Sequence, residues 1–139
     1  VRVFEKLGEP FELARALETL GRLELRRGRL DRAIEQLRSA LSEQERLSDV
    51  IGLARTTGAL SEALAKTGRM DDALALLRES VELNSTKGSA VGVAFNRRAF
   101  AELTRSPPDR SRAAMVAELE SRLVAAEELL GAVVLPGER

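Results

Sequence analysis

Paired acidic side chains are the residues of this 139-residue chain that come nearest to a catalytic or cation-binding set. The pairs are Asp71-Asp72, Glu118/Glu120 and Glu127-Glu128. Two carboxylates can act as general acid and base or can bind a hard cation. Residues one or two positions apart on a helix do not face each other, however. No calcium-loop spacing, Gly-x-x-x-x-Gly-Lys or Gly-x-Ser-x-Gly accompanies them, so we expect solvated helix surface.

A small basic cluster, Arg26-Arg27 with Arg29, could contact phosphate. Three arginines without aromatic neighbours are weak evidence for a nucleic-acid site, and surface solubility is the better interpretation. The chain contains neither histidine nor cysteine, which excludes Ser-His-Asp and Cys-His nucleophiles and thiolate metal sites. We therefore predict that the protein is not an enzyme and needs no cofactor or metal.

The composition indicates a soluble, folded domain. Hydrophobic residues make up 44% of the chain, which is enough for an ordinary core. The 22 Lys and Arg residues balance the 22 Asp and Glu residues, so no net field attracts nucleic acid or an anionic membrane. No membrane-length apolar run or basic-then-apolar leader is present in the sequence. A cytoplasmic location is the expectation that follows.

The elements that position these side chains come from a repeat of 40 residues. The segment 28–34 recurs as 68–74, and residues 11–50 share ten identities with residues 51–90. A fainter third copy follows. Within each period the apolar residues recur every three or four positions, which is typical of helix faces.

Each period reads as a helical hairpin. Gly28 and Gly68 stand where a first helix should stop, and Ser106-Pro107-Pro108 is a hard turn in the third hairpin. The spacing predicts helices over 10–27, 30–47, 50–67, 70–86, 90–105 and 109–130. This spacing divides the chain into the end of a preceding repeat helix (1–9), three hairpins (10–50, 51–90 and 91–130, the last divergent) and a tail (131–139). We expect the tail to fray because it has little apolar surface to bury.

Small and large residues alternate through the period in a recognisable order. The first copy has Ala14, Leu20-Gly21, Ala33, Leu37 and Ala40, and the second has Leu60-Ser61, Ala73, Leu77 and Ser80. This pattern resembles the tetratricopeptide repeat family, and the 40-residue period is similar to the longer variety in kinesin light chains and in sensor arms of signal-transduction ATPases and related bacterial regulators. The resemblance implies an all-α, right-handed superhelix of about three stacked hairpins. Its first helices would line a concave groove that holds a peptide, a partner helix or another domain.

Projecting the first helix of each hairpin predicts the groove side chains. Steps of three, four and three residues keep each set in one stripe. The stripes are Arg15, Glu18, Arg22 and Leu25, then Arg55, Gly58, Glu62 and Ala65, then Phe95, Arg98, Glu102 and Arg105. Five arginines against three glutamates favour an acidic peptide or helix as ligand. The alternative is that Arg15/Glu18, Glu18/Arg22 and Arg98/Glu102 simply pair along their own helices.

The function that follows is a protein- or peptide-binding scaffold or adaptor module, and we expect the chain to be part of a longer regulatory or scaffolding protein of bacterial type. A sensor or autoinhibitory arm of a multidomain signalling ATPase or transcription regulator is the alternative. A free-standing helical-repeat hydrolase would need convergent acidic residues in a closed pocket. By register the chain begins inside a hairpin, so Phe4 and Phe11 are either core residues or a face that permits self-association.

Overall fold

The computed structural model describes the backbone of residues 2–131 and 133–137 and the side chains of residues 8–131 and 133–137. This part of the chain contains six helices and no strand. They are α1 (Arg2–Arg26), α2 (Leu30–Arg46), α3 (Val50–Lys66), α4 (Met70–Lys87), α5 (Ala90–Leu103) and α6 (Ala113–Leu130). The predicted all-α helical repeat is confirmed, and each helix packs on its neighbours in the chain.

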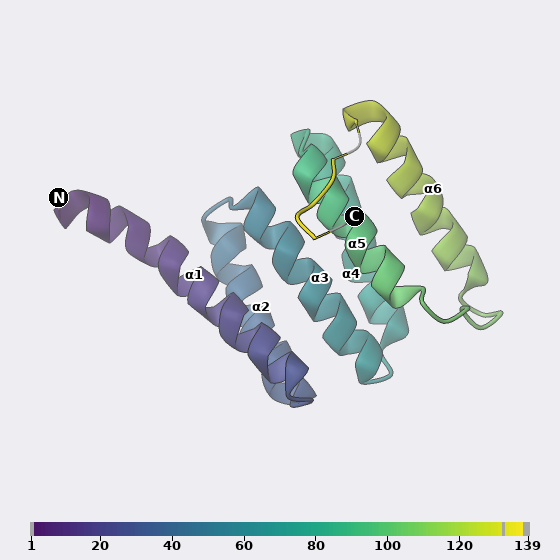
Figure 1. Cartoon of the computed structure of the whole chain (residues 1–139), viewed down its shortest axis with the longest axis horizontal. Helices are drawn as coiled ribbons and strands as arrows, with labels where there is room; N and C mark the ends of the chain where they lie inside the picture. Colours follow the sequence, from purple (N-terminus) through teal and green to yellow (C-terminus); the bar gives the residue numbers. More distant parts are fainter. Residues whose placement is uncertain (1, 132, 138–139) are drawn as a thin grey trace.

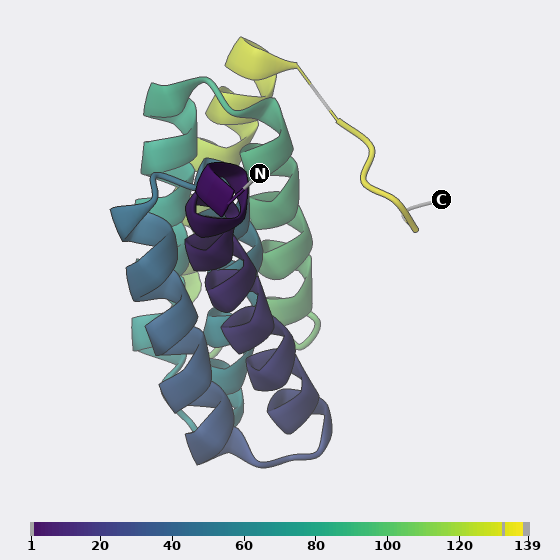
Figure 2. The same ribbon diagram turned by 90° about the vertical axis from the view of Figure 1, so that its left-hand side faces the viewer.

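The hairpins stack so that their first helices form one layer. Figure 1 shows α1, α3 and α5 side by side in front, with α2 and α4 behind them. Figure 2 shows the same two layers from the side. The last helix, α6, packs against both α4 and α5 at one end of the stack. The front layer is therefore a surface to which all three hairpins contribute.

Local sequence explains where the helices begin and end. Gly28 and Gly68 adopt φ values of 76° and 85°, the left-handed conformation that ends a helix and that glycine adopts without strain. The N-cap side chains of Asp49 and Ser89 each accept a hydrogen bond at 3.0 Å from the backbone N–H three residues later. These caps fix the start of α3 and α5, two of the three helices of the front layer.

The core repeats with the sequence. Ala33 and Leu37 of α2 are completely buried, and so are Ala73 and Leu77 one period later on α4. A Cβ atom on Gly21 would lie 2.6 Å from Leu37 Cγ, which is closer than real contacts allow. The small residues therefore let paired helices approach closely, as the small-large order predicts.

Buried amides also recur once per period, a feature that the sequence analysis did not identify. Gln44 and Asn84 occupy equivalent positions on α2 and α4 and are both buried. The Gln44 Nε2 group donates to Glu18 Oε1 at 3.1 Å, and Asn84 Nδ2 donates to Asn96 Oδ1 at 2.7 Å. Asn96 Nδ2 in turn donates to Ser80 Oγ at 2.8 Å. The amide nitrogens of Gln44 and Asn84 are thus paired, whereas their side-chain oxygens are buried without a partner among the described residues. The paired nitrogens favour this packing arrangement because an unpaired buried donor is costly.

Two helix starts differ from the prediction. The sequence predicts a preceding helix end over residues 1–9, whereas α1 runs without a break from Arg2. Pro10 lies inside this helix; it removes one backbone donor, and this loss alone does not end the helix. At the other end, α6 begins at Ala113, four residues later than predicted, because the turn after Pro108 extends to Arg112. The predicted bounds of α2 to α5 agree to within two residues.

The prediction that the tail has little to bury is wrong for the described residues 133–137. Leu135 is only 3% exposed, and Arg98 Nη2 donates a hydrogen bond to the Pro136 carbonyl at 2.9 Å. The segment turns back after α6 and runs along the front layer beside α5 (Figures 1 and 2). Removing one leucine side chain from water stabilises this arrangement by about 2 kcal/mol, a gain that sequence pattern alone does not reveal.

Candidate peptide-binding groove

The groove is a cavity of about 190 Å³ on the front layer between the three first helices. Gly58 lies at its centre, where an added Cβ would contact only Ala99 at 3.5 Å, so glycine leaves the space open. The lining comprises Arg22, Leu25 and Arg26 of α1, Ala54, Arg55, Gly58, Ala59 and Glu62 of α3, and Phe95, Arg98, Ala99 and Glu102 of α5.

The structure brings seven of the ten predicted groove residues to this cavity. They are Arg22, Arg55, Gly58, Glu62, Phe95, Arg98 and Glu102. Arg15 is exposed on α1 outside the cavity, and Arg105 is exposed beyond it, paired with Glu102 at 3.4 Å. Glu18 is buried and does not line the cavity. These three predicted positions are not part of the lining.

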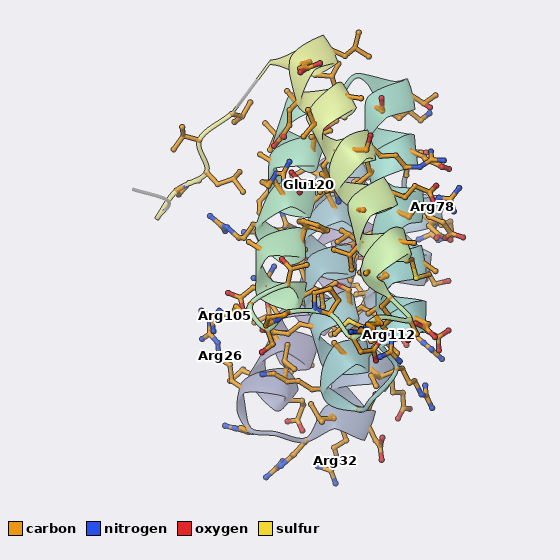
Figure 3. The ribbon with its side chains drawn as sticks, turned by 90° about the vertical axis from the view of Figure 1, so that its right-hand side faces the viewer. Arg26, Arg32, Arg78, Arg105, Arg112 and Glu120 are labelled. Carbon is orange, nitrogen blue, oxygen red and sulfur yellow. The ribbon has the colours of Figure 1, made fainter. Side chains whose placement is uncertain are left out.

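Sequence reasoning missed Arg26 and the small residues that let the cavity form. Arg26 follows Arg22 by one helical turn, so continuing the predicted stripe by four residues identifies it. Figure 3 shows Arg26 pointing to the side of the molecule on which the C-terminal segment lies, and Arg78 pointing to the other side. Ala54, Ala59 and Ala99 carry no polar group, and only the packed helices show that they line a cavity.

Glu18 is a buried carboxylate that binds two of the arginines lining the groove. It is 4% exposed and accepts two hydrogen bonds from Arg55, from Nε to Oε2 and from Nη2 to Oε1, both at 2.8 Å. The Gln44 amide donates to it as well, and Arg22 Nε lies 3.3 Å from Oε2. Glu18 therefore pairs with Arg22 along its own helix, but its bidentate partner comes from α3.

Burial and charge act in opposite directions on Glu18. Burial raises the pKa of a carboxyl group because it disfavours the charged form. The hydrogen bonds and charge of Arg55, with help from Arg22 and Gln44, outweigh burial and hold the pKa of Glu18 below its usual value. The group is thus a carboxylate at neutral pH, and it neutralises part of the positive charge above it.

Positive charge nevertheless exceeds negative charge around the cavity. Its lining contains four arginines and two glutamates. Burial lowers the pKa of Arg22, and repulsion from Arg55, Arg26 and Arg98 lowers it further, against the attraction of Glu18. Arg22 Nε is buried against the Glu18 carboxylate, whereas Arg26 on the next turn of α1 is exposed. The groove therefore offers donors and positive potential to an anionic group.

An aromatic side chain gives the groove one apolar wall. The Arg98 guanidinium lies over the Phe95 ring, 5.8 Å from its centre, on α5. Cation–π contact of this kind holds both side chains in place. A ligand in the groove meets a flat apolar surface and a fixed guanidinium at the same wall.

Most of the paired acidic residues bind arginines away from the groove, whereas Asp72 and Glu128 are exposed. Arg97 binds Glu120 at 2.6 Å and Glu127 at 2.7 Å, and Arg112 binds Asp71 at 2.8 Å. Figure 3 shows Arg112 and Glu120 on the side of the molecule formed by α6. Among the described residues, no group of acidic side chains has an arrangement that could hold a metal ion. The acidic pairs tie α6 to α4 and α5.

The basic cluster separates in the structure. Arg27 and Arg29 lie 3.9 Å and 3.6 Å from the carboxylate of Glu24, while Arg26 faces the groove. Arg27 and Arg29 therefore share the single negative charge of Glu24. No helix in the described part of the chain is long and apolar enough to cross a membrane.

Comparison with known protein families gives one match. A family model described as Tetratricopeptide repeat matches residues 3–86, which is more than half of the chain. The matched region covers α1, α2, α3 and nearly all of α4, and it ends before the third hairpin. No curated protein and no solved structure matches the chain.

Proposed function

Because the chain belongs to the tetratricopeptide repeat family, we propose that it is a scaffold or adaptor module that binds a protein segment in the groove. Repeats of this family generally mediate protein–protein interaction. A helical hairpin cannot bury its apolar face alone, and stacking creates an extended surface suited to a partner. The observation that carries the proposal is the open cavity to which all three hairpins contribute.

We propose further that the ligand is acidic. Four guanidinium groups surround the cavity, and one of them, Arg26, is exposed and makes no ion pair within the described part of the chain. Guanidinium groups bind carboxylates through two parallel hydrogen bonds, and such a site attracts an acidic partner in a salt-dependent way. The proposed setting is a cytoplasmic, longer regulatory or signalling protein of bacterial type.

Arg26 is the best residue with which to test an acidic ligand. It is exposed and makes no ion pair within the described part of the chain, whereas Arg55 and Arg98 are both engaged in internal hydrogen bonds. Peptides would be selected on the intact protein from a displayed random library, and their affinities measured by fluorescence anisotropy. We expect acidic sequences to be enriched, and Arg26→Glu to weaken their binding by about tenfold, or roughly 1.4 kcal/mol.

Arg38→Glu is the matched control, because Arg38 is an exposed arginine on α2, outside the groove. This variant changes the net charge equally and should alter affinity by less than about twofold. Enrichment of peptides without acidic residues, or equal binding to both variants at every salt concentration, would rule out an acidic ligand in this groove.

A second surface favours the alternative of an arm that packs on another domain or copy. Leu20 on α1 is 47% exposed, whereas Leu60, one period later on α3, is 2% exposed and belongs to the hydrophobic core. Leu13, Leu23 and Phe11 are also exposed on α1; the side chain of Phe4 lies outside the described residues. A helix of a second copy, or of a longer signalling protein, would cover this α1 face as the first hairpin covers α3.

A further inference from the structure

The C-terminal segment, residues 133–137, has the exposure pattern of a bound peptide. Leu135 is 3% exposed although the preceding Val134 is 71% exposed, and Pro136 and Gly137 are exposed as well. One deeply buried side chain within an otherwise exposed, non-helical stretch is an anchor. Short peptide ligands commonly bind through such an anchor, with their backbone groups contacting the receptor.

The segment is held by a residue that also lines the groove. Arg98 Nη2 donates to the Pro136 carbonyl at 2.9 Å, and the same guanidinium lies over Phe95. Val133 lines a smaller cavity between α5 and the end of α6, so the segment runs from there towards the groove. Figures 1 and 2 show it on the front layer, the face that α1, α3 and α5 share.

The residue types of the segment explain why it is not helical. Proline at position 136 has no backbone N–H and cannot continue a helix. Gly137 adopts φ of 87° and forms a turn with Pro136. A carbonyl acceptor is thus presented to Arg98 on the α5 wall of the groove, next to a buried apolar side chain.

We propose that the C-terminal segment is an intramolecular ligand that occupies the α5 wall of the groove and competes with an external peptide for Arg98. A ligand carboxylate that uses Arg98 must displace the Pro136 carbonyl, and Leu135 then loses its burial. Because the segment is tethered, its effective concentration is on the order of millimolar, so external ligands bind more weakly while it is in place. The competition rests on the proposed groove function, but binding of the segment itself does not.

The experiment uses the intact chain and a labelled synthetic peptide with the sequence of residues 131–139 as probe. Leu135→Asp should release the internal segment, because burial of a carboxylate without a partner is costly. We expect this variant to bind the probe at least about tenfold more tightly than the parent does. Shifts of the Phe95 and Arg98 amide resonances on addition of the probe would locate the binding.

Val134→Asp is the control, because it places the same charge at the exposed neighbouring position. It should bind the probe as weakly as the parent. Leu135→Ala removes the anchor without adding charge and serves as a second release variant if Leu135→Asp does not fold. Probe binding to the release variants no tighter than to Val134→Asp would overturn the proposal.

The library-selected peptides separate this inference from the proposed function. If they bind the release variants about tenfold more tightly than the parent, the segment competes for the groove. If they bind all variants equally while the probe distinguishes them, the competition is refuted and the groove function stands. Probe binding at Phe95 and Arg98 with no selected peptide at all supports the segment as ligand and contradicts the proposed external one.

Discussion

Glu18 determines what the arginines of the groove can do. Its carboxylate accepts hydrogen bonds from Nε and Nη2 of Arg55 and lies 3.3 Å from Nε of Arg22. Two of the four lining guanidinium groups are therefore already paired with a carboxylate of the protein. Arg55 is therefore first a structural residue that joins α3 to α1. Arg26, one turn after Arg22 on α1, has no ion pair among the described residues and is better placed to meet a ligand.

Replacing Arg55 should destabilise the protein more than it alters the surface. Arg55→Ala leaves the buried Glu18 without its bidentate partner, and we expect a loss of about 3 kcal/mol in the free energy of unfolding. Arg38→Ala, at an exposed arginine, should cost less than about 0.5 kcal/mol. Urea unfolding followed by circular dichroism measures both; equal stability of the two variants would contradict the structural role of Arg55.

Stability should also fall in acid. Glu18 has a lowered pKa for the reasons given above, and hydrogen bonding to Arg97 lowers the pKa of Glu127 below its usual 4.5. A carboxylate whose pKa is lower in the folded state stabilises the fold above the unfolded pKa, and this contribution is lost as pH falls through the folded value. We expect the free energy of unfolding to decrease below about pH 4.5.

The Glu18→Gln variant tests how much of the acid dependence belongs to this carboxylate. Its stability should be lower than that of the parent at neutral pH and should decline less steeply towards pH 3, because one titrating group has been removed. Glu128→Gln, at an exposed position, is the control and should follow the parent curve. A parent-like slope for Glu18→Gln would show that the acid sensitivity arises elsewhere.

Among the helices, the close approach of α1 and α2 depends on small side chains. Ala33 is completely buried where the two helices meet, so Ala33→Phe overpacks the hairpin and should cost about 1–3 kcal/mol. Ala117→Phe places the same side chain at an exposed position on α6 and should leave the melting temperature nearly unchanged. Thermal unfolding compares them, and a parent-like melt of Ala33→Phe would contradict the helix register.

Helix positions were predictable because glycine, proline and apolar periodicity are local signals. Gly28 and Gly68 end their helices as predicted, and projecting the first helices brings seven of ten predicted residues to one cavity. Glu18 was not recognised as buried, because its partner Arg55 lies 37 residues away. The burial of Leu135 likewise depends on a surface formed by distant segments, and a short tail with proline and glycine carries no periodic signal for it.

For the molecule as a whole, the exposed α1 face predicts association. Leu20 and Leu13 have the exposure of core positions that lack a neighbouring hairpin, and burying them removes apolar surface from water. We expect the protein to self-associate at high concentration and Leu20→Glu to shift it towards monomer. Val124→Glu, at a similarly exposed position on α6, is the control.

Sedimentation velocity over a range of concentrations measures this association. Monomeric behaviour of the parent at all concentrations would exclude this face as a self-association surface. Equal effects of the two glutamate variants would show that the association has no preference for α1.

The stacking order has a mechanical consequence. Within the described part of the chain, α1 packs on α2 and α3 but not on α5, so the first and third hairpins are joined only through the second. The groove nevertheless has walls from both α1 and α5. In a repeat array each unit contacts only its neighbours, so small rotations at successive interfaces change the curvature of the whole array. A ligand that contacts both Arg26 and Phe95 would connect the first and third hairpins directly and hold the array at one curvature.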